Sequence, residues 1–396
     1  MISSDKVEGL LRKKNVVGVG FGFGERKKSS EKVIRVYVEK KVKLSSLAEK
    51  DVIPGQIDGF RTDVIETGEI KALGILNLFE KTESSNPRTD RHRPVPNGVS
   101  IGNRKITAGT KGFEIIREGK RYAVSNAHVF CEDPRKNVSK QERRIHQPGP
   151  RDSSDLENTE VGRLVSHVII SEKGMNRVDT AICEFYNDED YTNEVFSAGK
   201  VITGSESARE GEEVRKVGRT TGLTAGKIVD VNATVRVNYG KFSALFTDQI
   251  IIQGKSGSFS SGGDSGSAIL NSDGKVVGLL FAGSSEVTVA NKIESILSVF
   301  SGRIALDKES KEVVVNFVVS RVNGIIRGRV TEVIDGEHVP VPSAKMTLYR
   351  KEGREEVETK YTDENGEYFF GASPGQYIIS FEKEGYVSQE KVANLS

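Results

Sequence analysis

The sequence predicts a mainly β protein with three folded parts: a small α+β module, a large barrel or double barrel, and a β-sandwich. Short runs in which Val, Ile or aromatic residues alternate with polar residues recur along the chain, and this alternation is typical of strands. Long runs with helical periodicity are scarce. The length of 396 residues agrees with two or three domains, since a domain usually has about 150 residues.

The composition limits the classes of function. Lys and Arg total 58 and Asp and Glu total 56, and the resulting net charge of +2 argues against binding to nucleic acid through a basic surface. No apolar run approaches the roughly 18 residues of a membrane span, so we expect no membrane partner. Met1–Lys14 contains no apolar signal core, which predicts a cytoplasmic location. Cys131 and Cys183 fit a reducing compartment, as two buried thiols or as an unusual disulfide.

Residues 1–76 are predicted to form the small α+β module. In Val16–Gly24, glycine alternates with Val and Phe, which is a strand pattern and not the strand-to-helix turn of a dinucleotide-binding loop. The other expected elements are strands at residues 33–38, 52–54 and 62–65 and a short helix at residues 44–50. The basic residues between Arg12 and Lys43 predict a solvated face, with contact to a partner or nucleic acid as the alternative.

The middle of the chain is predicted to be the barrel. Residues 77–98 are polar and proline-bearing, which indicates a linker. Residues 99–303 contain many short strands separated by Gly, Asn, Asp and Ser, and helical periodicity is found only in Val289–Phe300. A β-rich segment of this length, closed by one terminal helix, suits a large barrel or a double barrel.

The end of the chain is predicted to be a separate β-sandwich. Residues 304–322 form a connector that contains a strand at Val313–Val319. Residues 323–396 then alternate again, with turn signals at Thr362–Gly366 and Pro374–Gly375 between the apolar runs. This pattern favours a sandwich.

Three short motifs in the middle segment each carry one chemically active side chain. A strand with small residues brings His128 to a turn, Asp179 precedes an apolar strand, and Ser265 lies in a glycine-lined bend. In order, the motifs are Ala-Val-Ser-Asn-Ala-His-Val at 123–129, Val-Asp-Thr-Ala-Ile at 178–182 and Gly-Gly-Asp-Ser-Gly-Ser-Ala-Ile-Leu at 262–270.

The chemistry of these three side chains is complementary. A serine hydroxyl becomes a good nucleophile when a base removes its proton during attack, and histidine titrates near neutral pH. An aspartate next to the histidine fixes its tautomer and stabilises the imidazolium. Glycines beside the serine let backbone N–H groups approach a developing oxyanion. We therefore expect Ser265 as nucleophile, His128 as base, Asp179 as its orienting partner, and Gly263 and Ser265 as oxyanion donors.

Together these motifs resemble those of the chymotrypsin/trypsin-like serine peptidases. The strand and turn Val217–Gly226 (Val-Gly-Arg-Thr-Thr-Gly-Leu-Thr-Ala-Gly) is similar to one in a divergent bacterial-type branch. The resemblance covers residues 99–303 and implies a double β-barrel of the chymotrypsin type. It implies a serine endopeptidase that cuts protein or peptide substrates through an acyl-enzyme, with no cofactor and no metal.

The sequence departs from the family pattern at a few positions. Val129 follows the histidine where a cysteine is usual, and Ser267 replaces a common glycine. Neither change affects the mechanism. By the same resemblance, Phe259 lines the primary specificity pocket, and Phe281, Ala282 and Gly283 form its wall. An aromatic residue at position 259 cannot attract Lys or Arg by charge, so we expect a preference for apolar residues.

Other interpretations of the motifs remain open at this point. Ser265 would otherwise lie in an ordinary tight turn, His128 would be a core histidine, and Glu184 or Asp155 would orient the histidine in place of Asp179. The remaining histidines have no metal-ligand spacing: His92, His146, His167 and His338.

Two alternative functions remain open as well. One is a catalytically silent scaffold that binds proteins. The other is a regulated peptidase that cuts mainly itself or one dedicated partner, which the flanking modules and the linker at residues 77–98 motivate. A regulatory protein partner would then bind through the flanking domains.

The last part resembles the carboxypeptidase regulatory-like, transthyretin-type β-sandwich. The resemblance rests on Gly328-Arg-Val, Pro342-Ser-Ala-Lys-Met-Thr-Leu, Thr362-Asp-Glu-Asn-Gly-Glu-Tyr and Pro374-Gly-Gln-Tyr. It implies a domain without catalytic residues that serves stability or binding. We interpret Asp363 and Asn365 as part of a hairpin turn, with a calcium loop as the alternative.

Overall fold

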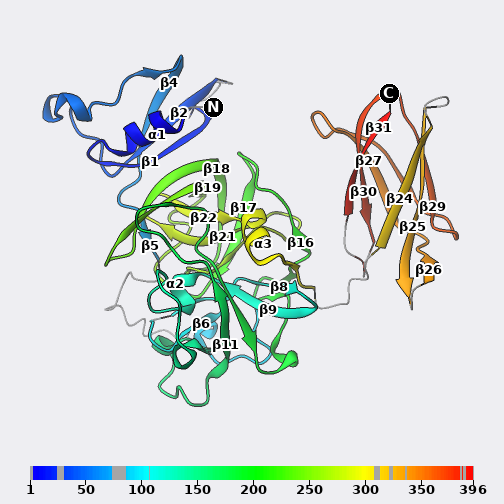
Figure 1. Cartoon of the computed structure of the whole chain (residues 1–396), viewed down its shortest axis with the longest axis horizontal. Coiled ribbons are helices and arrows are strands. Elements are labelled where there is room, and N and C mark those ends of the chain that lie inside the picture. Colours follow the sequence, from blue (N-terminus) through cyan, green and yellow to red (C-terminus); the bar gives the residue numbers. More distant parts are fainter. Residues whose placement is uncertain are drawn as a thin grey trace. The chain divides into compact units, whose positions relative to one another are not determined.

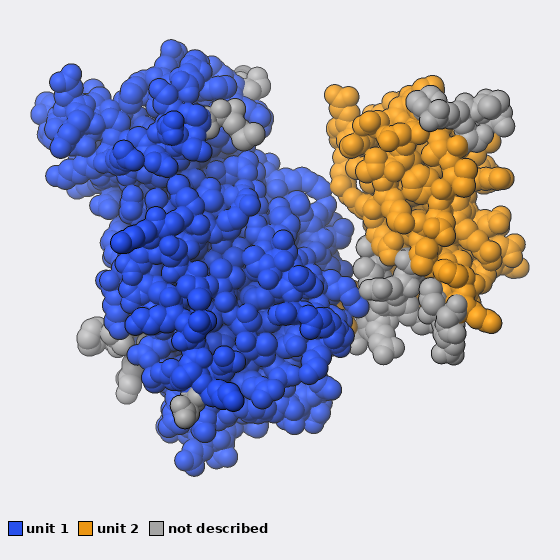
Figure 2. Space-filling model, in the orientation of Figure 1, with its two compact units in different colours: residues 1–305 blue, residues 306–396 orange. Residues whose placement is uncertain are grey.

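A computed structural model shows a mainly β protein, with 49% of residues in strands and 11% in helices. It describes residues 3–24, 31–73, 86–106, 108–306, 313–320, 324–334, 337–383, 386 and 389–395. The chain divides into two compact units, residues 1–305 and 306–396, which Figure 2 shows in different colours. Residues 77–85 of the expected linker and residues 307–312 and 321–322 of the expected connector lie outside the described residues.

The first barrel is an antiparallel sheet with the strand order β23-β8-β9-β13-β11-β10-β6-β7. Its strands are β6 (Ser100–Asn103), β7 (Gly109–Thr110), β8 (Phe113–Arg117), β9 (Lys120–Ser125), β10 (Arg144–His146), β11 (Glu160–His167), β13 (Ala181–Phe185) and β23 (Arg303–Ile304). Backbone bonds from Lys111 to Val99 and from Gly112 to Val124 join its two ends. Short helical turns lie in its loops: α2 (Ala127–Phe130), η3 (Pro87–Thr89), η4 (Lys140–Arg143), η5 (Pro150–Asp152) and η6 (Asp188–Asp190).

The second barrel is a closed ring with the order β19-β22-β21-β20-β17-β18, in which β18 pairs back onto β19. Its strands are β17 (Glu213–Gly218), β18 (Gly222–Asn238), β19 (Ser243–Gly254), β20 (Ala268–Leu270), β21 (Lys275–Gly283) and β22 (Thr288–Lys292). Two-residue strands flank the barrels: β12 (Met175–Asn176), β14 (Glu194–Val195), β15 (Lys200–Val201) and β16 (Gly204–Ser205). In Figure 1 the first barrel is drawn mainly in cyan and green and the second in green and yellow.

The expected helix at the end of the second barrel starts later than its periodicity predicts. Residues 288–292 form strand β22, and α3 covers only Ile293–Phe300. The prediction was wrong for Val289–Lys292 because ladders to β19 and β21 bury this segment on both edges. Tertiary pairing therefore overrides the local apolar pattern.

The N-terminal segment extends the sheet of the second barrel. Its elements are α1 (Ser4–Leu11), β1 (Val16–Phe23), β2 (Lys32–Val38), η1 (Leu44–Ser46), η2 (Glu49–Asp51), β3 (Gln56–Ile57), β4 (Phe60–Glu66) and β5 (Lys71–Ala72). Strand β1 pairs with β18 at Gly18↔Val235, so that the β1, β2, β4 and β3 ladder continues from the barrel. The expected helix at residues 44–50 is replaced by the two single turns η1 and η2, residues 52–54 form no strand, and α1 was not predicted.

The alternating glycines of β1 allow this close pairing. A Cβ atom at Gly20 would lie 1.8 Å from Asp230 Oδ2, and one at Gly18 would lie 2.9 Å from the side chain of Val235. Any side chain on this face would therefore push the segment away from β18. The glycines serve sheet packing, as their alternation predicts.

The second unit consists of two four-stranded antiparallel sheets around one apolar core. One sheet contains β24 (Val313–Ser320), β25 (Ile325–Ile334), β26 (Glu337–Pro340) and β29 (Glu367–Gly371). The other contains β27 (Lys345–Arg350), β28 (Glu356–Tyr361), β30 (Gly375–Glu382) and β31 (Gln389–Leu395). None of the helices in the described part of the chain has the length and hydropathy that a membrane span requires.

Candidate active site

His128 and Asp179 meet because their strands are neighbours. Strand β9 ends just before His128 and β13 begins just after Asp179, and the two strands pair antiparallel with Ala181 opposite Ser125. In an antiparallel pair, the end of one strand lies beside the start of the other. Asn126 strengthens the junction, because its side-chain amide donates to the carbonyl oxygen of Asp179 at 2.8 Å.

The Asp179 carboxylate holds the histidine ring. Its Oδ2 lies 2.6 Å from His128 Nδ1, and its Oδ1 accepts from the backbone N–H of His128 at 3.3 Å. Tyr239 from the second barrel donates its hydroxyl to the same Oδ2 at 2.7 Å. Complete burial acts to raise the pKa of Asp179, but the interactions with His128 and Tyr239 outweigh burial, so the pKa lies below its ordinary value.

Ser265 approaches the same histidine from the second barrel. Its Oγ lies 2.8 Å from His128 Nε2 and 3.3 Å from the carbonyl oxygen of Phe281. Gly266 has φ +94°, and a Cβ there would lie 2.2 Å from Ser125 Oγ and from the carbonyl oxygen of Thr110. Glycine is therefore required at this bend, and the bend directs the serine hydroxyl towards the imidazole.

A buried carboxylate beside the serine fixes the preceding loop. Asp264 accepts hydrogen bonds from the backbone N–H groups of Thr220 at 2.8 Å, Thr221 at 3.1 Å and Ser261 at 3.0 Å, and from Thr221 Oγ1 at 2.6 Å. Lys216 Nζ lies 3.4 Å from its Oδ2, and both side chains are fully buried. Burial lowers the pKa of Lys216, although the charge of Asp264 partly offsets this effect. The Arg-Thr-Thr-Gly turn, which supported the family resemblance, is thus one wall of the Asp264 site.

The loop held by Asp264 presents a backbone donor to a peptide carbonyl. Gly263 has φ +94°, and a Cβ there would lie 2.5 Å from Thr220 Oγ1. Its N–H donates to the carbonyl oxygen of Leu73 at 2.7 Å. This is the distance expected between an oxyanion donor and its acceptor.

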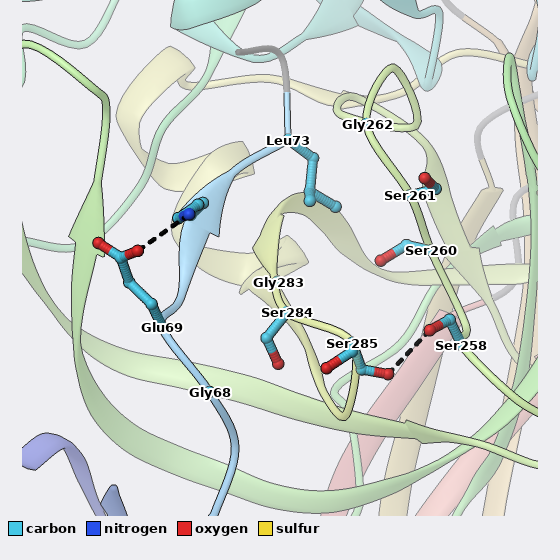
Figure 3. Close-up of a pocket in the computed structure, with 11 residues that line it drawn as sticks. Gly68, Glu69, Leu73, Ser258, Ser260, Ser261, Gly262, Gly283, Ser284 and Ser285 are labelled. Carbon is cyan, nitrogen blue, oxygen red and sulfur yellow. Dashed lines mark hydrogen bonds and ion pairs between the residues drawn. The ribbon is translucent and has the colours of Figure 1, made fainter. Parts of the chain in front are cut away.

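A pocket of about 350 Å³ lies beside this carbonyl group. Figure 3 shows the Leu73 side chain pointing between the Ser260–Gly262 segment and the Gly283–Ser284 segment. Hydroxyl groups line much of the pocket, and one of them, Ser260 Oγ, lies 2.5 Å from Thr288 Oγ1. No charged side chain is found on either of these two walls.

The four expected specificity residues have different positions. Phe259 is 3% exposed and belongs to the same apolar cluster as Leu73. Gly283 lines the pocket. The ring of Phe281 packs in another cluster, and its backbone carbonyl faces Ser265. Ala282 is fully buried and pairs with Ala72.

The competing residues lie elsewhere. Glu184 pairs with Arg163 at 2.7 Å, and Asp155 bonds Asn158, so neither orients His128. Cys131 and Cys183 are free and buried, and burial raises the pKa of both thiols. Within the described ranges, no group of three His, Cys, Asp or Glu side chains could hold a metal ion.

Sequence reasoning missed Tyr239, Lys216 and the segment that ends at Leu73. Tyr239 lies in a turn 60 positions from its partner Asp179, and Lys216 is one of many lysines in alternating strands. The polar phrase Gly-Glu-Ile-Lys-Ala-Leu at 68–73 has no pattern that indicates a site. Asp264 stands next to the serine in its motif, but the sequence alone indicates no separate role for it.

Part of the chain is similar to known proteins. Residues 110–279 match the family model of the trypsin-like peptidase domain. Among solved structures, the chain is similar to Thermobifida fusca protease A, with 20% identity, a TM-score of 0.40 and coverage of 53% of this chain and 97% of that one. It is also similar to Cellulomonas bogoriensis chymotrypsin, with 17% identity, a TM-score of 0.38 and coverage of 53% and 98%. No curated protein matches the sequence.

The middle of the chain is therefore similar to trypsin-like peptidase domains over residues 110–279. The fold class predicted from the sequence, a mainly β protein with a double β-barrel of the chymotrypsin type and a further β-sandwich, is confirmed.

Proposed function

We propose that this chain is a serine endopeptidase. Ser265 attacks a peptide carbonyl, and His128 takes the serine proton and passes it to the leaving amine. Asp179 holds the histidine ring and stabilises its protonated form, and the N–H groups of Gly263 and Ser265 bind the oxyanion. Water then releases the acyl group by the same steps.

The observation that carries this proposal is the unbroken path from carboxylate to nucleophile. Asp179 Oδ2 to His128 Nδ1 is 2.6 Å, and His128 Nε2 to Ser265 Oγ is 2.8 Å. Both are within the range that proton transfer requires. The 2.7 Å bond from Gly263 N to a peptide carbonyl argues against a silent scaffold, because a collapsed oxyanion loop would not direct this donor outwards.

We further propose a preference for an apolar residue, and for leucine in particular, before the cleaved bond. Leu73 is 3% exposed and packs in one cluster with Phe259 and Ile228. The two serine-lined walls carry no charge that would attract Lys, Arg, Asp or Glu. Substrates are therefore protein segments that offer a leucine in an extended conformation.

For the second unit, we propose a carboxypeptidase regulatory-like domain with a stabilising or binding role. Its two four-stranded sheets share a core of their own, which includes Ile326, Leu348 and Phe370. A unit with a separate core is expected to fold without the barrels.

A fluorophosphonate probe, which reacts with activated serines, tests the catalytic proposal. Ser265 is fully buried while Leu73 lies beside it, so the probe is given to wild type and to Leu73→Asp. An aspartate at position 73 is costly to bury in an apolar cluster, so the segment should undock and expose Ser265. We therefore expect peptide mapping of Leu73→Asp to find the label on Ser265.

Two serine variants serve as controls in the Leu73→Asp background. Ser265→Ala should abolish labelling, whereas Ser272→Ala, at an exposed serine close in sequence, should retain it. Equal labelling with and without Ser265, or no labelling of Leu73→Asp at all, would contradict the proposed function.

A further inference from the structure

The segment Gly68–Leu73 lies along the edge of β21 as an added strand (Figure 3). Strand β5 pairs antiparallel with β21, with Ala72 opposite Ala282 and Lys71 opposite Gly283. Leu73 N–H donates to the carbonyl oxygen of Phe281 at 3.3 Å. An extended peptide that adds a strand to a sheet edge is a common mode of peptide binding.

The ladder brings Leu73 to the reacting groups. The carbonyl oxygen of Phe281 accepts from Leu73 N at 3.3 Å and lies 3.3 Å from Ser265 Oγ, so one carbonyl group adjoins both the segment and the nucleophile. The carbonyl oxygen of Leu73 accepts from Gly263 N at 2.7 Å. Two bonds thus fix the backbone of Leu73: its N–H binds the carbonyl oxygen that Ser265 Oγ also approaches, and its own carbonyl oxygen binds the proposed oxyanion donor.

The side chain of Leu73 is held as firmly as its backbone. It is 3% exposed and clusters with Phe259, Ile228 and Leu280 of the second barrel. Removing the leucine side chain from water stabilises the docked segment. Upstream, Asn238 of β18 donates its side-chain amide to Glu69 Oε1 at 2.5 Å and its backbone N–H to Ile70 O at 2.9 Å. The segment is therefore bound on both sides and through its side chain.

We propose that this chain cuts itself after Leu73, with Ser265 of the same chain as the nucleophile. This inference rests on the proposed function. It names the first substrate of the site, which is the peptide bond that joins Leu73 to the next residue in the sequence, Gly74. Gly74 itself lies outside the described residues.

The steps balance as an ordinary hydrolysis. Ser265 Oγ bonds to the carbonyl carbon of Leu73 while its proton moves to His128 Nε2, and the oxyanion is held by Gly263 N–H. The bond to Gly74 breaks, and His128 gives the proton to the new amino group. Water then attacks the ester through His128, which returns Ser265 and leaves a carboxylate on Leu73.

The N-terminal segment is expected to remain bound after the cut. It is held by the β1–β18 ladder and by a buried polar cluster in which Arg35 NH1 lies 3.7 Å from Asp230 Oδ2 and Tyr37 donates to the same atom at 2.9 Å. Because substrate and nucleophile are already in one chain, the reaction needs no encounter and its rate is independent of protein concentration. The two pieces should separate only under denaturing conditions.

Intact-mass spectrometry of the purified full-length chain in heavy-oxygen water tests this inference. We expect two fragments under denaturing conditions, one that ends at Leu73 and carries one heavy oxygen in its new carboxylate and one that begins at Gly74. The rate should stay constant over a hundredfold dilution. A chain that remains whole, is cut elsewhere, or is cut at a rate proportional to its concentration would overturn the proposal.

Matched variants separate the role of Leu73 from general damage. Leu73→Asp should reduce the cleavage at least a hundredfold, whereas Leu44→Asp should be cut like wild type, because Leu44 is 71% exposed in the same N-terminal segment. Ser265→Ala should remain whole. Equal cleavage of Leu73→Asp and wild type would show that the docking of Leu73 beside β21 does not select the peptide bond that is cut.

The fluorophosphonate result distinguishes the two proposals. If Leu73→Asp is labelled on Ser265 and wild type stays whole, self-cleavage is wrong and the peptidase proposal stands. If Leu73→Asp is not labelled and wild type stays whole, the proposed function fails and self-cleavage fails with it.

Discussion

The two barrels position their reactive groups by different means. In the first barrel, His128 and Asp179 lie at adjoining ends of the paired strands β9 and β13, and this backbone pairing brings them together. In the second barrel, Ser265 lies in the loop between β19 and β20, where no ladder fixes it. This loop depends on the buried Asp264 and its five donor groups.

The difference predicts two kinds of response to mutation. Changing a polar group of the first barrel should remove chemistry and leave the structure intact, because the strands still pair. Changing the Asp264 site should disturb structure and chemistry together, because an unpaired charge remains in the core. The predictions below test this contrast, starting from the largest expected effect.

Asp179→Asn should lower kcat by about 10⁴-fold, and the strands should still pair, so that the chain folds with a lower urea midpoint. An amide at this position can donate to His128 Nδ1, which favours the wrong tautomer of the ring. The kcat for a leucine-containing peptide and the urea midpoint measure the two effects. Asp155→Asn, at a carboxylate that bonds only within its own loop, serves as control and should leave kcat unchanged. A tenfold effect or less for Asp179→Asn would remove the orienting role.

Lys216→Met should destabilise the first unit by about 3–5 kcal/mol, because it leaves Asp264 charged and buried without its cation. Activity should fall as well, since the loop that carries Ser265 loses its anchor. Urea unfolding measures the loss. Lys255→Met is the control, because Lys255 and its partner Glu213 are exposed, and its midpoint should match wild type. A stable Lys216→Met protein with low activity would mean that the ion pair positions the loop of Ser265 but does not stabilise the fold.

Gly263→Ala should lower kcat by about 10²–10³-fold, which is the usual cost of losing one oxyanion donor. The new Cβ would lie 2.5 Å from Thr220 Oγ1 at φ +94°, so the loop must turn its N–H away. Gly257→Ala is a matched control, because Gly257 has φ +98° but open space around its Cβ position. If kcat falls by the same factor in both variants, the cause is backbone strain and not the loss of the oxyanion donor.

The catalytic side chains could be proposed from the sequence because each stands in a short phrase with a fixed local geometry. A histidine after a small-residue strand and a serine between two positive-φ glycines are properties of a few neighbouring residues. The β-rich class was predicted for the same reason, because alternation is local. The catalytic roles remain proposals, whereas the fold class is confirmed.

What could not be predicted depends on contacts between distant parts of the chain. Lys71 and Ala72 form a strand of two residues, which is too short to show any periodicity. This strand exists because its residues pair with Gly283 and Ala282 on β21, which lie far away in the sequence. The start of α3 was misplaced because the ladders of β22 are formed by strands far away in sequence. Such pairings have no local signal.

Tyr239→Phe should have the smallest effect, and it tests the hydrogen bond that links a tyrosine of the second barrel to Asp179 of the first. The Tyr239 hydroxyl donates to Asp179 Oδ2 at 2.7 Å, and a hydrogen bond to a charged group contributes about 1.5–3 kcal/mol.

The effect of Tyr239→Phe should depend on pH. Burial raises the pKa of Asp179, but His128 and Tyr239 lower it below its ordinary value. The stability from this ionised carboxylate is therefore present above the unfolded pKa of about 3.9 and is lost as pH falls through the lower folded pKa. Urea unfolding should show the full deficit of Tyr239→Phe at pH 7 and a shrinking deficit in acid. Tyr186→Phe, which removes an exposed bond to Glu160, should show a smaller deficit at pH 7, and equal deficits would mean that the buried bond adds nothing.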